Sequence, residues 1–399
     1  MRILILGGAG AMAEAIERDL LEMDADETSK MVIADRNQKR LQERVNALQD
    51  ARVSAVVVDI ADHNALVKQL TGFDLVVSAA LAQTTLRVLN AALEAKVNVV
   101  TLATLDLPGA APGAPLDELG LPTESFKEEI NERFARAGLT ALLGMGSGPG
   151  TSNVMGRFFG DKLDSVESMA FSYAYAHLGE AKSFFPFDPR GIIGQYNLSP
   201  VILRRGKLMR VPARYGRETE IYPDPIGVRE VFYVLHSEPV CFARAFKDKG
   251  LKDAGTKAGW GPEFLAKLEF LDSLGLLDMQ PRPIGNGSVA PVDVLESGLT
   301  RHETVQTKDY GCFRLVIKGE KSREKLEYTA EVFTKPYKNL NGTQHRTGIP
   351  AAVAARMMGR GNITQKGAFS PEAGVDPAIY FRELERRDIH LYYTVRYYA

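Results

Sequence analysis

Short apolar runs and amphipathic segments alternate through the first 145 residues of the chain. The apolar runs occupy residues 2–6, 30–34, 53–58, 73–77, 97–103 and 139–145. The segments between them repeat apolar residues at helical spacing, as Leu41, Val45 and Leu48 do within residues 37–50, where charged residues such as Arg44 are predicted to face solvent. Strands and helices that alternate at this length make a doubly wound parallel sheet with right-handed crossovers. This part is therefore predicted to be an α/β domain of the Rossmann type.

The pattern changes at about residue 165, where apolar and polar residues begin to alternate with period two. Strands are predicted over residues 168–175, 200–212, 230–236, 311–317 and 325–333. The second of these resembles a hairpin that turns at Arg205-Gly206-Lys207, and the last two pair across the charged turn 318–323. One clear helix, residues 262–274, interrupts them. The pattern predicts a second, α+β domain built on an antiparallel sheet.

Helical segments follow the second sheet. Gly348, Ile349 and Pro350 precede a helix of small residues at 351–358, and a further helix spans 379–387. Helices in this place are expected to pack back on the first domain. The predicted organisation is therefore a first domain at 1–150, a second at 151–340, and a C-terminal return at 341–399.

The segment 106–122 breaks the alternation because it is dense in Pro and Gly, and it is predicted to be a loop. Loops of this length are often functional or mobile, and this one follows a strand, so a lid is one interpretation. A passive surface loop is the interpretation that we favour.

Gly8, Gly10 and Ala13 stand between the first predicted strand and the first helix, with the spacing G-x-G-x-x-[GA]. The first glycine permits a tight turn, the second lets a pyrophosphate approach the backbone, and the small third residue lets the helix pack close to the strand. The N–H groups that begin the helix, at Ala11 and Met12, and the positive end of its dipole suit phosphates. A glycine-rich stretch alone often marks only a turn, so the assignment of a dinucleotide site depends on the strand that follows.

Asp35 ends that strand, near the position roughly 20 residues past the glycines where a dinucleotide fold places the carboxylate that binds the adenosine ribose. The two signals together predict a nicotinamide dinucleotide site. A carboxylate about 4 Å from a 2′-phosphate would be repelled by roughly 4 kcal/mol at an effective dielectric of 20, which favours NAD. Arg36 follows directly and can neutralise a 2′-phosphate, so NADP stays open.

Further residues at strand ends are assigned to the cofactor. Asp59 follows the third strand, either near the adenine or as a simple strand-end cap. Ala79 and Ala80 follow the fourth strand and are small enough for backbone to approach a flat cofactor. Thr101 lies in the fifth strand. Ligands of such a sheet bind beyond the carboxyl ends of its strands.

Gly148 and Gly150 belong to a second glycine-rich turn, residues 146–153, which follows the sixth strand and leads into a helix. Its backbone N–H groups suit an anion, and a substrate carboxylate is the natural candidate. An interdomain hinge is the alternative, and the two roles are compatible.

Composition narrows the class of protein. A chain of 399 residues exceeds one ordinary core, and 45% hydrophobic with 25% charged residues is typical of a soluble globular protein. A net charge of −1 gives no electrostatic case for nucleic acid or an anionic membrane, and no apolar run approaches the ~18 residues that span a bilayer. Cys241 and Cys312 lie far apart, and the histidines show no ligand spacing. We expect a cytoplasmic protein without a structural metal.

Five stretches carry a resemblance that runs over nearly the whole chain. They are Leu6 to Met12, Gly148-Pro149-Gly150, Gly191 to Pro200 with Arg205-Gly206-Lys207, Gly227 to Pro239, and Thr347 to Ala351. In this order they resemble the saccharopine dehydrogenase-like family, and within it most closely the lysine 6-dehydrogenase branch. The stretch 228–239 does not match the lysine enzymes closely, so the substrate stays open.

The resemblance implies a Rossmann domain, an inserted α+β domain that carries the substrate pocket and dimer contacts, and a C-terminal return. Enzymes of the family oxidise an amine carbon with NAD(P), or condense an amine with a carbonyl reductively. It therefore implies a small amino acid or amine as substrate and a homodimer as the assembly.

Hydride transfer needs few protein groups, because the nicotinamide carries the chemistry. The protein must remove a proton from the amine, and histidine side chains ordinarily change charge near neutral pH, so His236 is the first candidate for the base. Tyr233 lies in the same predicted strand, and Tyr196 and Lys182 are alternatives, the lysine if desolvation lowers its pKa. A lone strand histidine is also often only a hydrogen-bonded residue.

The substrate carboxylate needs a clamp, and guanidinium groups bind carboxylates in bidentate fashion. Arg204, Arg205 and Arg229 are the candidates, although each is more often a solvated surface charge. Thr347, with Gly348, is expected to touch the nicotinamide face.

Three functions follow from these assignments. The first is oxidative deamination of lysine or a related amine at the ε-carbon. The second is reductive C–N bond formation, as in saccharopine reductases and carboxynorspermidine dehydrogenases. The third, from another class, is a non-catalytic NAD-sensing protein.

Overall fold

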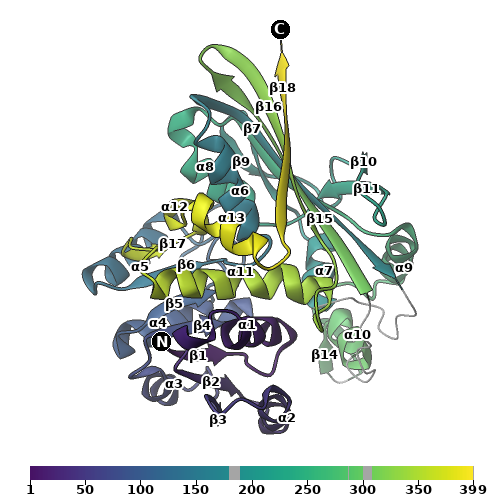
Figure 1. Ribbon diagram of the computed structural model, residues 1–399. Coiled ribbons are helices and arrows are strands. Elements are labelled where there is room, and N and C mark those ends of the chain that lie inside the picture. Colours follow the sequence, from purple (N-terminus) through teal and green to yellow (C-terminus); the bar gives the residue numbers. More distant parts are fainter. Residues whose placement is uncertain (179–188, 286, 300–307, 399) are drawn as a thin grey trace.

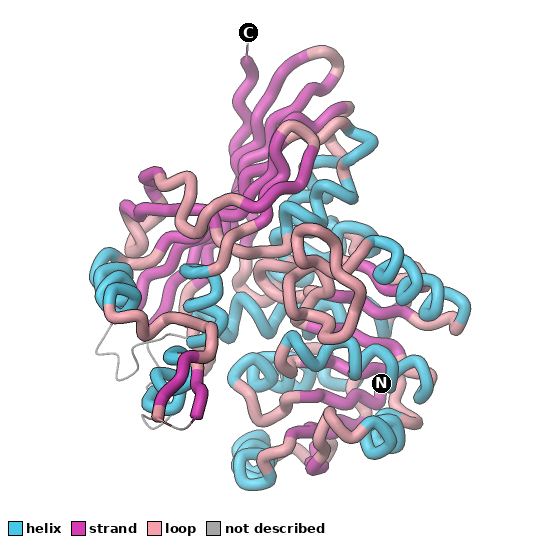
Figure 2. The backbone as a smooth tube through the Cα atoms, turned by 180° about the vertical axis from the view of Figure 1, so that it is seen from behind, coloured by secondary structure: helices cyan, strands magenta, loops and turns pink. Residues whose placement is uncertain are grey.

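The computed structural model describes residues 1–178, 189–285, 287–299 and 308–398. Two sheets lie one above the other, and helix α11 (Gly342–Gly359) runs across between them (Figure 1). Seen from behind, loop segments lie between the two sheets (Figure 2). Helix α11 contacts strands of both sheets. It is therefore the element through which the two halves of the molecule are joined.

The first sheet is parallel throughout, in the order β17-β6-β5-β4-β1-β2-β3. Its strands are β1 (Arg2–Leu6), β2 (Lys30–Asp35), β3 (Val53–Val57), β4 (Leu75–Ser78), β5 (Asn98–Thr101), β6 (Thr140–Leu143) and β17 (Gly367–Phe369). Its connecting helices are α1 (Ala11–Glu22), α2 (Gln38–Leu48), α3 (His63–Leu70), α4 (Thr85–Ala95) and α5 (Glu124–Arg136). The predicted Rossmann-type domain is confirmed. The chain reverses direction across the sheet between β3 and β4, so the carboxyl ends of β1 and β4 form the switch point where ligands bind.

Strand β17 was not among the predicted elements. It comes from the C-terminal part of the chain and pairs with β6 in parallel. A strand of three residues is too short for its periodicity to be recognised in the sequence.

The second sheet has the strand order β10-β11-β12-β7-β15-β16-β18, with β8 and β9 off this path. Its strands are β7 (Ser165–Leu178), β8 (Val201–Arg204), β9 (Lys207–Arg210), β10 (Glu218–Ile221), β11 (Val228–Tyr233), β12 (Asp253–Gly259), β15 (Lys308–Lys321), β16 (Glu324–Thr334) and β18 (His390–Tyr398). The predicted hairpins β8–β9 and β15–β16 are present. The sheet is mixed rather than purely antiparallel, because β12 pairs with β7 in parallel.

The second half also holds more helices than the pattern predicted. Helix α9 (Pro262–Ser273), α6 (Thr151–Gly160) after the second glycine turn, and α13 (Pro377–Glu385) lie where helices were expected. The further helices are α7 (Pro189–Asn197), α8 (Glu238–Ala245), α10 (Pro291–Leu299) and α12 (Pro371–Gly374), and β13 (Arg282–Ile284) pairs with β14 (Gly287–Val289) apart from the main sheets. Strand β11 ends at Tyr233, so the prediction of a strand through His236 was wrong. His236 lies in the short connection to α8.

Helix α11 begins before the residues from which it was predicted. Asn341 and Gln344 form a capping box, in which Asn341 Oδ1 accepts from Gln344 N at 2.8 Å and Gln344 Oε1 accepts from Asn341 N at 3.0 Å. Pro350 therefore lies inside the helix, not ahead of it. A proline there removes one backbone hydrogen bond, at a cost of about 3 kcal/mol. The helix tolerates it because both faces are buried between the two sheets, from Ile349 to Met357.

The C-terminal return is divided between the two halves. Helix α11 and strand β17 join the first domain, whereas β18 forms the edge of the second sheet beside β16. Strand β18 was not predicted. Its alternation is weak in the sequence because tyrosines occur on both faces, Tyr393 and Tyr397 on one and Tyr392 and Tyr398 on the other.

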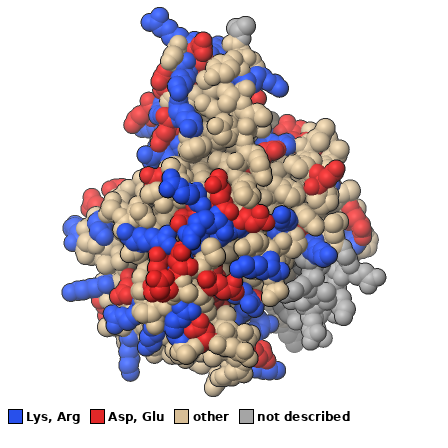
Figure 3. Space-filling view, viewed as in Figure 1, with Lys and Arg blue, Asp and Glu red and all other residues tan. Residues whose placement is uncertain are grey.

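The surface is mixed in charge. On the face shown in Figure 3, Lys and Arg side chains are intermingled with Asp and Glu over the first domain and α11. Among the described residues, no helix is long and apolar enough to cross a lipid bilayer.

The contact between α11 and α1 depends on Gly348. A Cβ at this position would lie 2.5 Å from Ala15 Cβ and 2.7 Å from Met12 O, closer than packed atoms approach. We expect Gly348→Ala to force the helices apart, lower the free energy of unfolding by about 1–3 kcal/mol and weaken NAD(P)H binding, because Met12 lies in the first turn of α1. Urea titration and nucleotide fluorescence would measure the two effects.

The matched control is Gly298→Ala, another helical glycine, where an added Cβ meets nothing within 4 Å. Removing a helical glycine there should leave nucleotide binding unchanged and raise the stability by up to about 1 kcal/mol. Equal effects of the two substitutions would show that the α1–α11 contact does not restrict residue 348.

Candidate active site

The first glycine turn has the geometry that a diphosphate requires. Gly7 has φ +74°, Gly8 N donates to Ala34 O at 3.1 Å, and Gly10 N donates to Gly7 O at 2.9 Å. A Cβ on Gly8 would lie 2.8 Å from Ile33 Cβ, so strand and turn touch. Gly10 is the N-cap of α1 and has no side chain to occupy the first N–H groups of the helix. The first backbone N–H groups of α1 can therefore donate to a bound anion.

Asp35 faces this turn, as predicted. Its Oδ2 accepts from Ala9 N at 3.4 Å and its Oδ1 from Asn37 N at 3.0 Å. These two bonds fix the carboxylate at the end of β2, where an adenosine ribose would lie. Arg36 is exposed beside it. The residues present therefore fit a nicotinamide dinucleotide.

The remaining predicted cofactor residues differ in their positions. Ala79 and Ala80 lie against Gly7, whose Cβ would be 2.9 Å from Ala79 C and 3.0 Å from Ala80 N. Asp59 is exposed and its Oδ1 accepts from Ala61 N at 2.8 Å, as a strand-end cap does. Thr101 is 1% exposed, and its hydroxyl accepts from Ala103 N. Thr101 thus supports the turn after β5 with its side chain.

Arg44 was predicted to face solvent, and this prediction was wrong. Its side chain is 14% exposed, pairs with Glu14 at 2.9 Å and donates to Gly10 O at 3.3 Å. It also lies 3.6 Å from the fully buried Glu17. The guanidinium thus supports the glycine turn from α2. Helical periodicity alone places Arg44 beside the exposed Arg40, so only the tertiary contact with α1 reveals its role.

The second glycine turn is equally tight. Gly150 has φ +131°, and a Cβ there would lie 2.0 Å from Gly146 O. Gly150 N donates to Asn153 Oδ1 at 3.0 Å, which fixes the start of α6. Ser147 Oγ lies 3.3 Å from Thr347 Oγ1, so the turn meets α11. Thr347 therefore contacts the second turn, and the adjacent Gly348 contacts α1, the helix that follows the first turn.

A buried histidine–carboxylate pair lies beside this second turn. His236 Nδ1 is hydrogen-bonded to Glu238 Oε2, and Ser152 Oγ donates to Glu238 Oε1 at 2.7 Å. A Cβ on Gly148 would lie 3.0 Å from Glu238 Oε1 and 3.4 Å from His236 Cε1. Burial acts to raise the pKa of Glu238, but His236 and Ser152 hold it below its ordinary value. The carboxylate is thus ionised and holds the imidazole against the turn.

Glu238 was missed in the sequence. The two residues of the pair are separated by Ser237, and a His-x-Glu triplet occurs too often to indicate a site by itself. The triplet indicates a site only in the structure, where α8 begins at Glu238 and turns the side chains of His236 and Glu238 toward Gly148.

An aromatic wall continues from His236 along β7. Phe171, Tyr173, Tyr175 and His177 alternate along one face of this strand. The Tyr173 ring lies 5.5 Å from the His236 ring, and Tyr173 OH donates to Gln195 Oε1 at 3.0 Å. The wall therefore leads away from the histidine pair on the side facing α11.

The far end of the wall holds charged groups. The guanidinium of Arg346 lies 4.3 Å from the Tyr175 ring centroid and pairs with Asp309 at 2.9 Å. His177 Nε2 has no hydrogen-bond partner among the described residues, and burial lowers the pKa of His177 to about 4. The wall thus ends at the neutral imidazole of His177 and at the ion pair between Arg346 and Asp309.

Of the other predicted catalytic residues, Tyr233 and Tyr196 do not lie beside the His236–Glu238 pair. Tyr233 shares its face of β11 with Val231, which packs with Ala174 and Tyr222 on the side of the sheet opposite to Tyr173. Tyr233 instead stacks with Tyr215 at 6.3 Å. Tyr196 is buried in the core between Phe232 and Arg214. Lys182 lies outside the described residues.

The predicted carboxylate clamps also differ. Arg204 is exposed at the end of β8, and Arg205 is exposed directly after it. Arg229 is half-buried and donates to the carbonyl oxygens of Tyr175 and Val228, and burial lowers the pKa of Arg229. Arg229 therefore lies against the strand that carries the aromatic wall.

Asp106, at the start of the predicted loop, anchors the histidine pair from the other side. It is 4% exposed and pairs with Arg244 of α8 at 2.9 Å and with Lys127 of α5 at 2.8 Å. Burial acts to raise the pKa of Asp106, but the two cations hold it well below its ordinary value. The segment 106–122 is a loop, as predicted, and this ion pair fixes its first residue to the helix that begins at Glu238.

The comparisons with known proteins agree with this geometry. A family model described as the saccharopine dehydrogenase NADP binding domain matches residues 3–142, and one described as the saccharopine dehydrogenase C-terminal domain matches residues 157–389. The chain belongs to the saccharopine dehydrogenase family. The family that the sequence resembles is thus confirmed, and this saccharopine dehydrogenase-family protein is an NAD(P)-dependent oxidoreductase.

Several relatives match most of the chain. Carboxynorspermidine synthase of Vibrio alginolyticus is 24% identical over 87% of this chain and 83% of its own. Carboxyaminopropylagmatine dehydrogenase of Synechocystis sp. is 23% identical over 96% of this chain and 95% of its own. The assignment to the lysine 6-dehydrogenase branch stays a prediction.

Two solved structures share the fold. Saccharopine dehydrogenase (L-Glu forming) of Saccharomyces cerevisiae has a TM-score of 0.75 at 15% identity, covering 99% of each chain. Homospermidine synthase of Legionella pneumophila, solved in complex with NAD, has a TM-score of 0.65 at 14% identity, covering 98% of this chain and 91% of its own. Both similarities extend over the two sheets.

We expect Glu238→Gln to lower kcat by about 10²–10⁴-fold, the typical contribution of a general acid–base group, because the amide cannot stabilise a protonated His236. NAD(P)H affinity should not change, since Glu238 lies at the second turn and not at the first. Steady-state kinetics and nucleotide titration on the same preparation would measure both.

Glu383→Gln is the control for the loss of a buried carboxylate. Glu383 is 8% exposed and pairs with Arg387, away from the histidine pair. It should lower stability and leave kcat intact. Full kcat in Glu238→Gln would exclude the role assigned to the pair.

Glu17 makes the stability of the first domain depend on pH. It is 0% exposed, its oxygens have no hydrogen-bond partner among the described residues, and burial raises the pKa of Glu17 to about 8. Between the ordinary pKa of a glutamate and pH 8, Glu17 is ionised in the unfolded chain and neutral in the folded protein. Stability therefore falls as pH rises through this window, by at most about 1.4 kcal/mol per pH unit from this group.

Glu17→Gln should remove that slope, so that the variant gains stability over the wild type progressively from pH 5 to pH 8. Chemical denaturation at four pH values would show it. Glu22→Gln, an exposed acid on the same helix, is the control and should show no such trend. A constant difference between Glu17→Gln and the wild type would contradict the assignment.

Proposed function

We propose that this enzyme forms a secondary amine from an amine and an aldehyde, with a reduced nicotinamide cofactor, and catalyses the reverse oxidation. The observation that carries the proposal is the buried His236–Glu238 pair set against Gly148, with Thr347 of α11 beside the same turn. The names carboxynorspermidine and carboxyaminopropylagmatine of the relatives denote secondary amines, which supports this direction.

His236 is the proton carrier in this proposal. Because its Nδ1 faces Glu238, Nε2 is the nitrogen left to exchange a proton with the substrate. In the condensation the amine nitrogen attacks the aldehyde carbon, a proton from His236 helps the oxygen leave as water, and an imine results. The cofactor, when bound, supplies the hydride that the imine carbon takes, and the nitrogen gains a proton. In the reverse direction His236 removes that proton.

Glu238 acts on His236 and not on the substrate. It is 0% exposed and accepts from both His236 and Ser152, so no oxygen is left to contact a ligand. An ionised carboxylate at this position fixes the imidazole tautomer and stabilises its protonated form.

The aromatic wall of β7 is the proposed place of the substrate chain. The faces of Tyr173 and Tyr175 suit the alkyl part or the cationic end of an amine. None of the predicted clamps is assigned to the substrate carboxylate: Arg204 and Arg205 are exposed, and Arg229 shares its face of β11 with Val231 and donates to backbone carbonyls.

NAD is the proposed cofactor, with NADP as the alternative. The fixed carboxylate of Asp35 supports NAD, because it would repel a 2′-phosphate. The description of the family model and the exposed Arg36 support NADP.

Cytoplasmic location and assembly as a homodimer are further parts of the proposal. Cys241 and Cys312 are free and buried, which supports a reducing compartment. Exposed tyrosines on the edge strand of the second sheet support contact between two copies.

A second candidate function is oxidative deamination of lysine at its ε-carbon. It is favoured by the five stretches that resemble the lysine 6-dehydrogenase branch, and the same histidine pair would serve as the base. It differs from the first proposal in needing no aldehyde.

Spectrophotometry at the reduced nicotinamide band separates these functions. We expect NADH or NADPH to be oxidised only when a diamine and an aldehyde-bearing amino acid are both present, and the rate to fall in Glu238→Gln. Reduction of NAD by lysine alone would support the second candidate. Saturable nucleotide binding without turnover on any amine would overturn both and indicate a nucleotide sensor.

A further inference from the structure

Helix α6 begins with three consecutive polar residues, Thr151, Ser152 and Asn153, whose side chains are all buried. Each side chain is hydrogen-bonded to a different helix: Thr151 to α13, Ser152 to α8 and Asn153 to α12. Helix α6 contacts all three of these helices, which gather around it in Figure 1. Because α12 and α13 belong to the C-terminal return, the last part of the chain holds the start of α6.

Asn153 is the point at which this arrangement meets the second glycine turn. Its Oδ1 accepts from Gly150 N at 3.0 Å, and its Nδ2 donates to Glu372 Oε2 at 2.8 Å. If the amide were turned the other way, its N–H groups would face the N–H of Gly150, and its oxygen would face the carboxyl group of Glu372. Gly150 and Glu372 together therefore determine which way the amide of Asn153 faces.

Glu372 lies on α12, 219 residues after Asn153 in the chain, and is buried. Both of its carboxylate oxygens are used within the protein, since Oε1 accepts from Ser370 Oγ and Oε2 accepts from Asn153. Arg157 of α6 also donates to the backbone carbonyl of Glu372 at 2.7 Å. Glu372 is thus attached to α6 through its side chain and its backbone, and it acts on a substrate only through the residues that it holds.

We propose that Glu372 is a positioning residue for the proposed reaction and acts on His236 through the start of α6. By fixing the amide of Asn153, Glu372 fixes the first turn of α6, which carries the Ser152 hydroxyl. That hydroxyl donates to Glu238, which in turn holds the imidazole of His236 by a hydrogen bond. The inference rests on the proposed role of His236 as the proton carrier, and it gives α12 a part in placing that histidine.

Glu372→Met tests this role, because methionine has a similar length and no oxygen that accepts from Asn153. It should lower kcat of the reaction between amine and aldehyde by about 10- to 10²-fold, since a small misplacement of a reacting group costs rates of this order. The dissociation constant of NADH, titrated by fluorescence on the same preparation, should not change, because the first glycine turn is untouched. Unchanged NADH binding also shows that the variant is folded, and Glu372→Ala should give the same result.

Glu372→Gln is the conservative variant and should restore most of the wild-type kcat. Its amide oxygen accepts from Asn153 Nδ2 as the carboxylate does. Burial raises the pKa of Glu372 above its ordinary value, so a neutral side chain is a close substitute at this position.

A double-mutant cycle tests the route to the histidine. Ser152→Ala should lower kcat as Glu372→Met does, and the double variant should be no slower than the slower single variant, because both act on one hydrogen bond. The pH profile should change as well. Burial acts to raise the pKa of Glu238, and His236 and Ser152 hold it low. Losing the Ser152 bond raises that pKa, so the acid limb of kcat should move to higher pH in all three variants.

Tyr380→Phe is the matched control. Thr151 Oγ1 lies 2.7 Å from Tyr380 OH, so the variant removes a buried hydrogen bond from the same turn of α6 and leaves Ser152 and Asn153 with their partners. It should keep the kcat and the pH profile of the wild type.

Three results would each overturn the proposal: wild-type kcat in Glu372→Met, losses that multiply in the double variant, or an equal loss in Tyr380→Phe. Failure of the proposed function gives a different result. Full kcat in Glu238→Gln would overturn the role of the histidine pair and this inference with it, whereas a slow Glu238→Gln beside a fast Glu372→Met would overturn the inference alone.

Discussion

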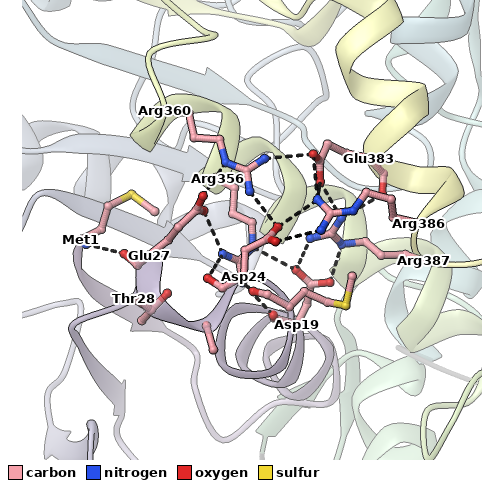
Figure 4. Close-up of polar contacts among 12 residues, drawn as sticks. Met1, Asp19, Asp24, Glu27, Thr28, Arg356, Arg360, Glu383, Arg386 and Arg387 are labelled. Carbon is pink, nitrogen blue, oxygen red and sulfur yellow. Dashed lines mark hydrogen bonds and ion pairs between the residues drawn. The ribbon is translucent and has the colours of Figure 1, made fainter.

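The structure depends on the contact between α11 and α1, which joins the two halves of the molecule. The helices touch at Gly348, and at the other end of the contact Arg356 and Arg387 lie buried beside Asp19 of α1 (Figure 4). Around them, Arg360, Arg386 and Glu383 extend the network to Asp24 and Glu27. Buried ion pairs of this kind add little net stability, but losing one partner leaves a buried charge uncompensated, at about 3–5 kcal/mol. The network therefore fixes the relative position of the two halves more than it adds to the net stability of the fold.

That fixed position gives the site its geometry. Successive residues of α11 face different parts of the site: Arg346 lies over Tyr175, Thr347 meets Ser147 of the second turn, and Gly348 lies against α1 behind the first. One turn of α11 thus sets the separation between the first glycine turn and the aromatic wall. Asp106 fixes the histidine pair from the opposite side through Arg244. His236, the proposed proton carrier, is therefore tied to residues of both domains.

The sequence could predict what local pattern determines. The strands of the first sheet, its glycine turn and Asp35 follow from short-range periodicity and spacing, and they lie where they were expected. Arg44 and Glu238 could not be found this way, because their roles arise from contacts with α1 and Gly148 that no local pattern encodes. The sequence pattern missed β17 and β18 for related reasons: β17 is too short for its periodicity to be recognised, and β18 has tyrosines on both faces. Tyr233 shows the reverse error: successive side chains of a strand point to opposite faces, so Tyr233 and His236 could not both face one side of the same strand.

The strand order also has a consequence for synthesis of the chain. Residues 367–369 complete the first sheet beside β6, and residues 390–398 complete the second beside β16. Domains generally begin to fold as they leave the ribosome, N-terminal part first, yet here both halves wait for the last tenth of the polypeptide. The edge of β6 therefore stays unprotected from residue 143 until residue 367 is made, and the edge of β16 from residue 334 until residue 390, which are the intervals open to wrong strand pairing.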